Sequence, residues 1–212
     1  MELDADRRLA LAYARARLRP ALEALWRLDA TLGAVLAGGR ERQVTRIRLA
    51  WWREALERLE REPPPPEPVL RGIAAHGLPG AELAAMTEGW EELLADGPLG
   101  PAALQAYAAA RGGALFRHSA RLLGLPDHPV EAAGRRWALV DLARRSADPA
   151  EAGAALAAAR EAGKDPPWPR PVRPLGMLAV LAARDAARPG GLARQGSPAR
   201  MLRMLRHRLT GQ

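Results

Sequence analysis

Apolar residues recur at spacings of three and four along almost the whole chain, and strand-like alternation is almost absent. Leu and Ala dominate these positions, while Val and Ile are scarce. The pattern predicts an all-α fold. Helices are expected over residues 6–19, 20–37, 43–62, 67–76, 80–95, 101–124, 129–146, 148–162, 174–187 and 198–209. No repeat of fixed period interrupts them, so we expect a single domain over residues 1–212.

Two adjacent tryptophans, Trp51 and Trp52, lie on the helix expected over residues 43–62. An apolar stripe runs through each of them, which makes the apolar face too wide for a simple surface helix. We expect this helix to pack between two neighbours, with both rings in the core. The alternative is that these rings form the wall of a ligand cavity together with Trp90 and Trp137.

Two acidic residues fall on apolar helix faces. Asp29 lies in line with four leucines of the second helix, and Asp141 follows Trp137 on the helix expected over residues 129–146. An unpaired buried carboxylate costs several kcal/mol, so each acid needs a partner or a polar cavity. One interpretation is an ion pair with Arg46 or Arg145. The other is a cavity at the centre of a helical bundle, with acids facing inward.

Composition adds a strong positive charge. The formal charge is +8, and arginine supplies nearly all the cations because Lys164 is the only lysine. The bias is typical of a genome rich in G and C, with arginines on solvated faces. The alternative is a basic surface for an anionic partner such as a diphosphate, a phospholipid or a nucleic acid. The chain has no cysteine, which excludes disulfides and thiolate sites.

Neither a membrane span nor a secretory signal is evident, so we expect a cytoplasmic location. The last helix is basic and amphipathic and is suited to an anionic lipid or a partner groove. The alternative is that it docks on its own bundle. We expect no nucleic acid partner, because no recognition fold is present. The apolar residues on one face of this helix are Met201, Leu202, Leu205 and Leu209. The arginines that flank the other face are Arg200, Arg203, Arg206 and Arg208.

A set of five segments carries a family resemblance. The segments are "EALWRLDATLGAV" (23–35), "IRLAWWREALERL" (47–59), "MTEGWEELL" (86–94), "YAAARGGALFRHSARLLGL" (107–125) and "AGRRWALVDLARRSAD" (133–148). In their order and separation they resemble the squalene/phytoene synthase family of the isoprenoid synthase superfamily. The tryptophan helix followed by a Pro-rich loop is most similar to the phytoene-synthase-like subgroup related to the mitochondrial complex I assembly factor. The Gly112-Gly113 pair within these segments indicates a close helix contact or a kink.

The resemblance implies a single helical bundle around a central cavity. In active members, two aspartate-rich motifs face each other there and hold magnesium ions, which bind the diphosphates of two prenyl diphosphates. This chain departs from both motifs. Asp29 is the one acid kept of three in the first motif. In the second motif, Asp141, Arg144, Arg145 and Asp148 occupy the matching positions, and Arg145 reverses the charge of the central aspartate.

These departures predict a degenerate member that is not catalytic and needs no cofactor. We expect a helical binding or assembly factor, with a protein or a lipid as partner, near a membrane or respiratory complex. The alternative is a prenyl-diphosphate-binding protein or a magnesium-dependent prenyltransferase. Asp29, Asp141 and Asp148 would then hold a metal ion, and Arg144 and Arg145 would bind a diphosphate directly.

Overall fold

The protein is described by a computed structural model over residues 2–39, 41–188 and 191–212. All regular elements in these ranges are helical, which confirms the all-α prediction. The α-helices are α1 (Ala5–Ala12), α2 (Arg19–Ala37), α3 (Arg42–Arg58), α4 (Pro68–Ala75), α5 (Gly80–Ala84), α6 (Met86–Glu92), α7 (Pro101–Tyr107), α8 (Ala114–Leu122), α9 (Glu131–Arg145), α10 (Pro149–Glu161), α11 (Arg173–Ala187) and α12 (Pro198–Thr210).

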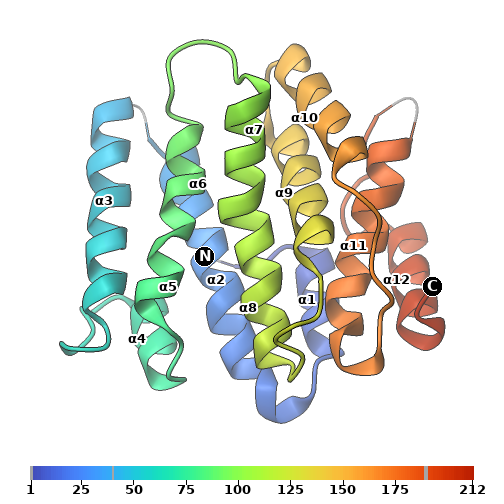
Figure 1. Ribbon diagram of the computed structural model, residues 1–212, viewed down its shortest axis with the longest axis horizontal. Helices are drawn as coiled ribbons and strands as arrows, with labels where there is room; N and C mark the ends of the chain where they lie inside the picture. The colour runs from blue at the N-terminus through green and yellow to red at the C-terminus, as the bar shows by residue number, and fades with distance from the viewer. Residues whose placement is uncertain (1, 40, 189–190) are drawn as a thin grey trace.

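The long helices stand side by side, with α3 at one edge of the bundle and α12 at the other (Figure 1). Between them lie α2, α8, α9 and α11. The N-terminal α1 packs against both α11 and α12, so the first and last helices of the chain are neighbours. Buried apolar side chains from nearly every helix form a shared core.

Most helices begin and end near the predicted residues. Proline stands in the first turn of α2, α4, α7, α10 and α12, where its missing N–H costs nothing. The first helix is shorter than predicted. It ends at Ala12 instead of Arg19, and a turn with a 3-10 segment, η1 (Ala16–Leu18), follows. The helix expected over residues 101–124 is one rod in which a π-helical segment, η2 (Ala108–Gly113), joins α7 to α8.

Two glycines bring η2 and α9 into backbone contact. A Cβ atom on Gly112 would lie 2.1 Å from the carbonyl oxygen of Gly134, and a Cβ on Gly134 would lie 2.2 Å from that of Gly112. Only glycine permits this approach. The expected close helix contact at Gly112 is therefore confirmed. It holds the residue before it, Arg111, against α9.

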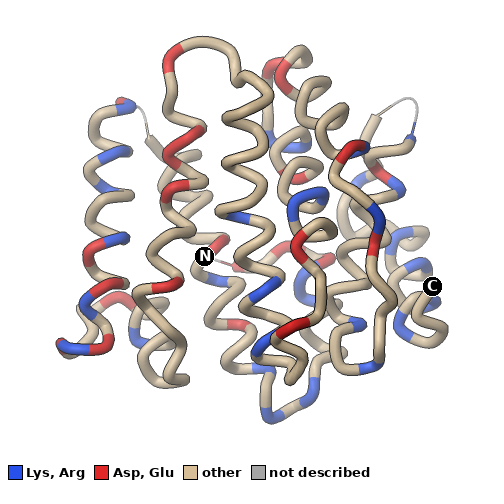
Figure 2. Tube along the Cα trace, in the orientation of Figure 1, with Lys and Arg blue, Asp and Glu red and all other residues tan. Residues whose placement is uncertain are grey.

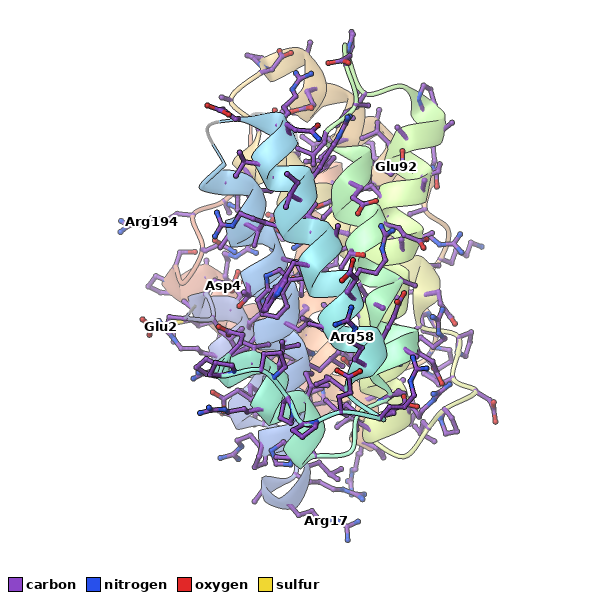
Figure 3. The ribbon with its side chains drawn as sticks, turned by 90° about the vertical axis from the view of Figure 1, so that its left-hand side faces the viewer. Glu2, Asp4, Arg17, Arg58, Glu92 and Arg194 are labelled. Carbon is purple, nitrogen blue, oxygen red and sulfur yellow. The ribbon has the colours of Figure 1, made fainter. Side chains whose placement is uncertain are left out.

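The tryptophan helix, α3, has neighbours on one side only. It packs against α2, α5 and α6, and its other side carries charged residues along much of its length (Figures 2 and 3). Trp52 is buried, but the exposed fraction of Trp51 is 45%. The prediction that both rings lie in the core is wrong for Trp51. An edge helix cannot bury two adjacent stripes, because nothing covers the second.

Candidate functional site

The two acids on apolar faces meet at the centre of the bundle, joined by one arginine. Asp29 of α2, Asp141 of α9 and Arg111 of η2 are all buried. Arg111 Nε donates to Asp29 Oδ1 at 2.8 Å, and Arg111 Nη2 donates to Asp29 Oδ2 at 3.1 Å. The same Nη2 donates to Asp141 Oδ2 at 2.6 Å. A single guanidinium therefore bridges the two helices.

Two further arginines complete this arrangement. Arg7 Nη1 donates to Asp29 Oδ2 at 2.9 Å, and the same side chain pairs with Asp4. Arg145 Nε donates to the shared Asp141 Oδ2 at 2.9 Å. We call the resulting set the central network: Asp4, Arg7, Asp29, Arg111, Asp141 and Arg145. Its three carboxylates and three guanidinium groups cancel in formal charge.

Aromatic rings enclose the bridging guanidinium. The Arg111 Cζ atom lies 4.2 Å from the ring centroid of Trp90 and 4.9 Å from that of Trp137. Arg111 Nη1 donates a hydrogen bond to the hydroxyl of Tyr107. Ring faces attract a desolvated cation, so these contacts favour the guanidinium where it lies. Two of the predicted cavity-wall residues, Trp90 and Trp137, thus face the centre, but Arg111 fills the space between Asp29 and Asp141.

The charges at the centre shift the pKa values of its members. Burial would raise the pKa of Asp141, but the guanidinium groups of Arg111, Arg145 and Arg7 lower it below its usual range. Burial would lower the pKa of Arg111, yet Asp29, Tyr107 and Asp141 raise it well above its ordinary value. The partners of these two groups stabilise their charged forms, so Asp141 and Arg111 stay ionised across the physiological pH range.

The sequence identified both buried acids, Asp29 and Asp141, but only one of the arginines that bind them. Arg145 was one of the two expected partners and does bind Asp141. Arg46, the other, donates instead to the carbonyl oxygen of Leu94 at 3.0 Å. Arg7 and Arg111 were missed. Arg111 had a recognisable signal, because it is a lone cation on an apolar stripe formed by Leu104, Tyr107, Ala108 and Leu115.

The remaining candidates lie outside the central network. Arg144 donates to Asp185 Oδ2 at 2.9 Å and to the carbonyl oxygen of Ala193 at 2.7 Å. Asp148 is exposed and caps α10, where it accepts the Ala150 N–H at 2.9 Å. Asp148 and Arg144 therefore do not belong to the set of side chains that joins Asp29 to Asp141. Asp148 has the usual role of an aspartate before a helix.

A second ion-pair set lies beside the first, where α12 meets the bundle. Arg200 Nη2 lies 2.9 Å from Asp6 Oδ2, and Arg200 Nη1 pairs with Asp185, which also receives Arg144. We call Asp6, Arg144, Asp185 and Arg200 the outer network. A cavity of about 20 Å³ separates it from the central network. That volume holds one water molecule.

The residues at the centre do not fit a magnesium cluster. Mg²⁺ requires several oxygen ligands in near-octahedral geometry. Both carboxylate oxygens of Asp29 are already hydrogen-bonded to arginines, and Asp148 is elsewhere. Over the described ranges of the chain, no group of three or more acidic or histidine side chains is placed to hold an ion. The arrangement binds a guanidinium where a metal site would need free oxygens.

Open grooves run along the outer side of α2. One, of about 600 Å³, is lined by three arginines and two acids, with a floor of small residues of α2; the charged residues are Arg7, Arg8, Arg145, Glu2 and Asp4. The other, of about 540 Å³, lies between α2 and α3 and is lined in part by Trp51 and Trp52. Both tryptophans therefore border an outer groove and not the centre.

Comparison with known proteins gives a family match. The sequence model of a family described as squalene/phytoene synthase matches residues 2–164, which is more than half of the chain. The matched range contains the whole central network. No curated protein and no solved structure gave a match. None of the helices in the described part of the chain is long and apolar enough to cross a membrane.

Proposed function

The chain belongs to the squalene/phytoene synthase family, and we propose that it is a non-catalytic member that acts as a helical binding or assembly factor. The observation that carries this proposal is the position of Arg111. Its guanidinium bridges Asp29 and Asp141, the acids that the family resemblance assigns to magnesium binding. A cation supplied by the chain itself neutralises them.

The bridge also leaves Arg111 little capacity to act on a substrate. A diphosphate leaves only when its growing charge is neutralised, usually by metal ions held on carboxylates. Arg111 has five N–H donors, and four hydrogen bonds to Asp29, Asp141 and Tyr107 use most of them. The acids are therefore not free to hold a metal ion, and the arginine is not free to bind a diphosphate. The centre is built to hold helices together.

Product analysis tests the absence of catalysis. The purified protein is incubated with farnesyl or geranylgeranyl diphosphate and Mg²⁺, and extracted lipids are separated by chromatography. We expect no condensed product. A metal-dependent head-to-head product would overturn the proposal. In parallel, Mg²⁺ should leave the melting temperature unchanged, because a metal that bound the native state would raise it.

The assembly role rests on the resemblance to the subgroup related to the complex I assembly factor and on one exposed surface. Ile47 and Trp51 of α3 have exposed fractions of 60% and 45% beside the groove between α2 and α3. Exposed aromatic and aliphatic side chains of this kind mark protein contact sites. We place this role in the cytoplasm, at the surface of the inner membrane or of a respiratory complex. A partner protein that co-purifies with the wild-type protein but not with the Trp51→Ser variant would support this role. Equal recovery of that partner with both proteins would contradict it.

A second candidate function is binding of a prenyl diphosphate without turnover. The groove of about 600 Å³ favours it, because the three arginines in its lining outnumber the acids Glu2 and Asp4 and lie beside an apolar floor of small α2 residues. Arginine matches phosphate geometry, and the floor would cover a prenyl tail. Calorimetry with farnesyl diphosphate, with and without Mg²⁺, tests this function. Metal-independent binding that Arg8→Gln weakens would support it, and no binding under either condition would leave the assembly role alone.

A further inference from the structure

The last helix, α12, docks on the bundle with the opposite face from the one its sequence pattern indicates. Its buried residues are Arg200, Met204 and His207. Its leucine-rich face points outward, and the exposed fractions reach 70% for Leu202 and 78% for Leu209. The docking alternative is therefore correct, yet the apolar face stays open to solvent. An amphipathic helix normally buries that face.

Contacts at both ends fix this orientation. Arg200 pairs with the two aspartates of the outer network. His207 stacks edge-on against Trp168, with ring centroids 6.0 Å apart. Arg173 Nη1 donates to the carbonyl oxygens of Arg208 at 3.0 Å and Leu209 at 2.8 Å. Rolling the helix to bury its leucines would break all of these contacts, so the outward apolar face is part of the fold.

The surroundings of this face are basic. Residues 186–212 and 7–22 contain no aspartate or glutamate, and the two segments meet where α1 contacts α12. The Arg208 guanidinium lies 5.8 Å from the ring centroid of Tyr13, which is 40% exposed in the turn after α1. Arg17 of that turn projects away from the end of the bundle (Figure 3). Within the described chain, Arg203, Arg206 and Arg208 make no ion pair.

We propose that this surface docks on an anionic lipid bilayer. We call it the α12 face and define it by Tyr13, Met201, Leu202, Arg206, Arg208 and Leu209. Its leucines protrude, and protruding apolar side chains flanked by arginines suit a fluid interface with negative headgroups. Two copies packed through this face would bring their arginines together, so charge favours an anionic partner. The inference concerns a different surface from the assembly site on α3 and does not depend on the absence of catalysis.

Vesicle sedimentation of the whole protein tests this inference. Vesicles of phosphatidylcholine alone are compared with vesicles that also contain phosphatidylglycerol. We expect wild-type protein to pellet only with the anionic vesicles. The double variant Leu202→Ser/Leu209→Ser should lower the partition coefficient at least about tenfold, because two apolar side chains no longer enter the bilayer interface. The single variant Arg206→Glu should lower it about thirtyfold, since it changes the charge by two units and each unit near such a surface contributes about 1 kcal/mol. Val44→Ser is the matched control, because Val44 is 48% exposed on α3, which lies at the opposite edge of the bundle.

Several outcomes would overturn the inference. Equal pelleting with neutral and anionic vesicles would show that negative headgroups do not attract the protein. Unchanged pelleting of the leucine variant would show that the α12 face is not the binding surface. Sedimentation equilibrium without lipid gives the oligomeric state. A wild-type dimer that the leucine variant converts to a monomer would assign this face to self-association. Binding to polyglutamate but not to vesicles would assign it to an acidic protein. Circular dichroism should show the same melting curve for all variants, because every changed side chain is exposed.

Discussion

Arginine bridges two aspartates from different helices at two places in this molecule. At the centre, Arg111 joins Asp29 of α2 to Asp141 of α9. At the edge, Arg200 of α12 joins the aspartates of α1 and α11. The chemistry is the same in both, because a carboxylate in an apolar interior needs a paired cation and hydrogen bonds. The surroundings are different.

The central bridge is enclosed on all sides, and the outer bridge holds a terminal helix. Arg111 has no exposed surface and stacks on Trp90. In the outer network, Asp185 keeps Arg144 as a second partner, and Asp6 also accepts the backbone N–H of Gly196 at 3.2 Å. Loss of the central bridge should therefore unfold the whole bundle more easily. Loss of the outer bridge should release α12 while the bundle persists.

The largest expected effect comes from Arg111→Met. The variant keeps the length of the side chain but leaves two buried carboxylates without their shared cation. We expect the free energy of unfolding to fall by about 3–5 kcal/mol. Urea denaturation followed by circular dichroism measures it. Arg117→Met is the matched control on the same rod, because Arg117 is exposed. This control should change the free energy of unfolding by no more than about 0.5 kcal/mol. Equal losses in the two variants would contradict a structural role for the bridge.

We expect a smaller loss in the free energy of unfolding when the geometry of the centre changes but its charges are kept. Gly112→Ala would place a Cβ atom 2.1 Å from the carbonyl oxygen of Gly134 and would push η2 away from α9. We expect a loss of about 2–3 kcal/mol, typical of overpacking. Gly153→Ala is the control, because a Cβ atom there meets nothing within 4 Å. It should stabilise α10 by up to about 1 kcal/mol. A neutral Gly112→Ala would show that the close approach is not required.

The outer bridge is tested by Arg200→Met. Burial would lower the pKa of Arg200, but hydrogen bonds to Asp185 and Asp6 raise it, so the native state favours the charged form. We expect the variant to lose about 2 kcal/mol of local stability in α12. Hydrogen exchange should then accelerate in α12 and stay unchanged in α9. Equal acceleration in both helices would show that the outer network also supports the centre.

The sequence predicted the helices well because their signals are local. Spacing of apolar residues, proline in first turns and glycine at ends depend on neighbours in the chain. The end of α1 at Ala12 was missed because no proline or glycine occurs between there and Pro20. The turn instead depends on contacts with α12, such as that between Tyr13 and Arg208.

The site was predictable only in part because pairing is not local. Asp29 and Asp141 were recognisable as acids on apolar stripes, but Arg111 lies 82 residues from Asp29. The orientation of α12 could not be predicted from its own pattern. Its sequence favours burial of the leucines, whereas partners from distant segments, Asp6 and Trp168, bind the opposite face.

The smallest expected effect concerns a buried histidine that, unlike the paired arginines, is neutral in the folded state. His118 of α8 is 3% exposed, and its Nε2 atom has no hydrogen-bond partner among the described residues. Burial, together with the nearby Arg117 and Arg121, lowers its pKa from 6.5 to about 4, against an opposing effect of Glu82. His118 is therefore neutral in the folded state at a pH where the paired arginines are charged.

This difference gives a pH dependence with a definite sign. Between pH 7 and pH 5 the unfolded chain protonates His118 but the folded chain does not, so stability falls as the pH is lowered. The share of His118 should be about 1–2 kcal/mol over this range. His118→Gln removes that share, so its unfolding free energy should depend less steeply on pH than that of the wild type. Because carboxylates titrate mostly below this range, the bridges of Arg111 and Arg200 should contribute little to the slope. Identical slopes for the two proteins would show that His118 finds a partner that stabilises its charged form.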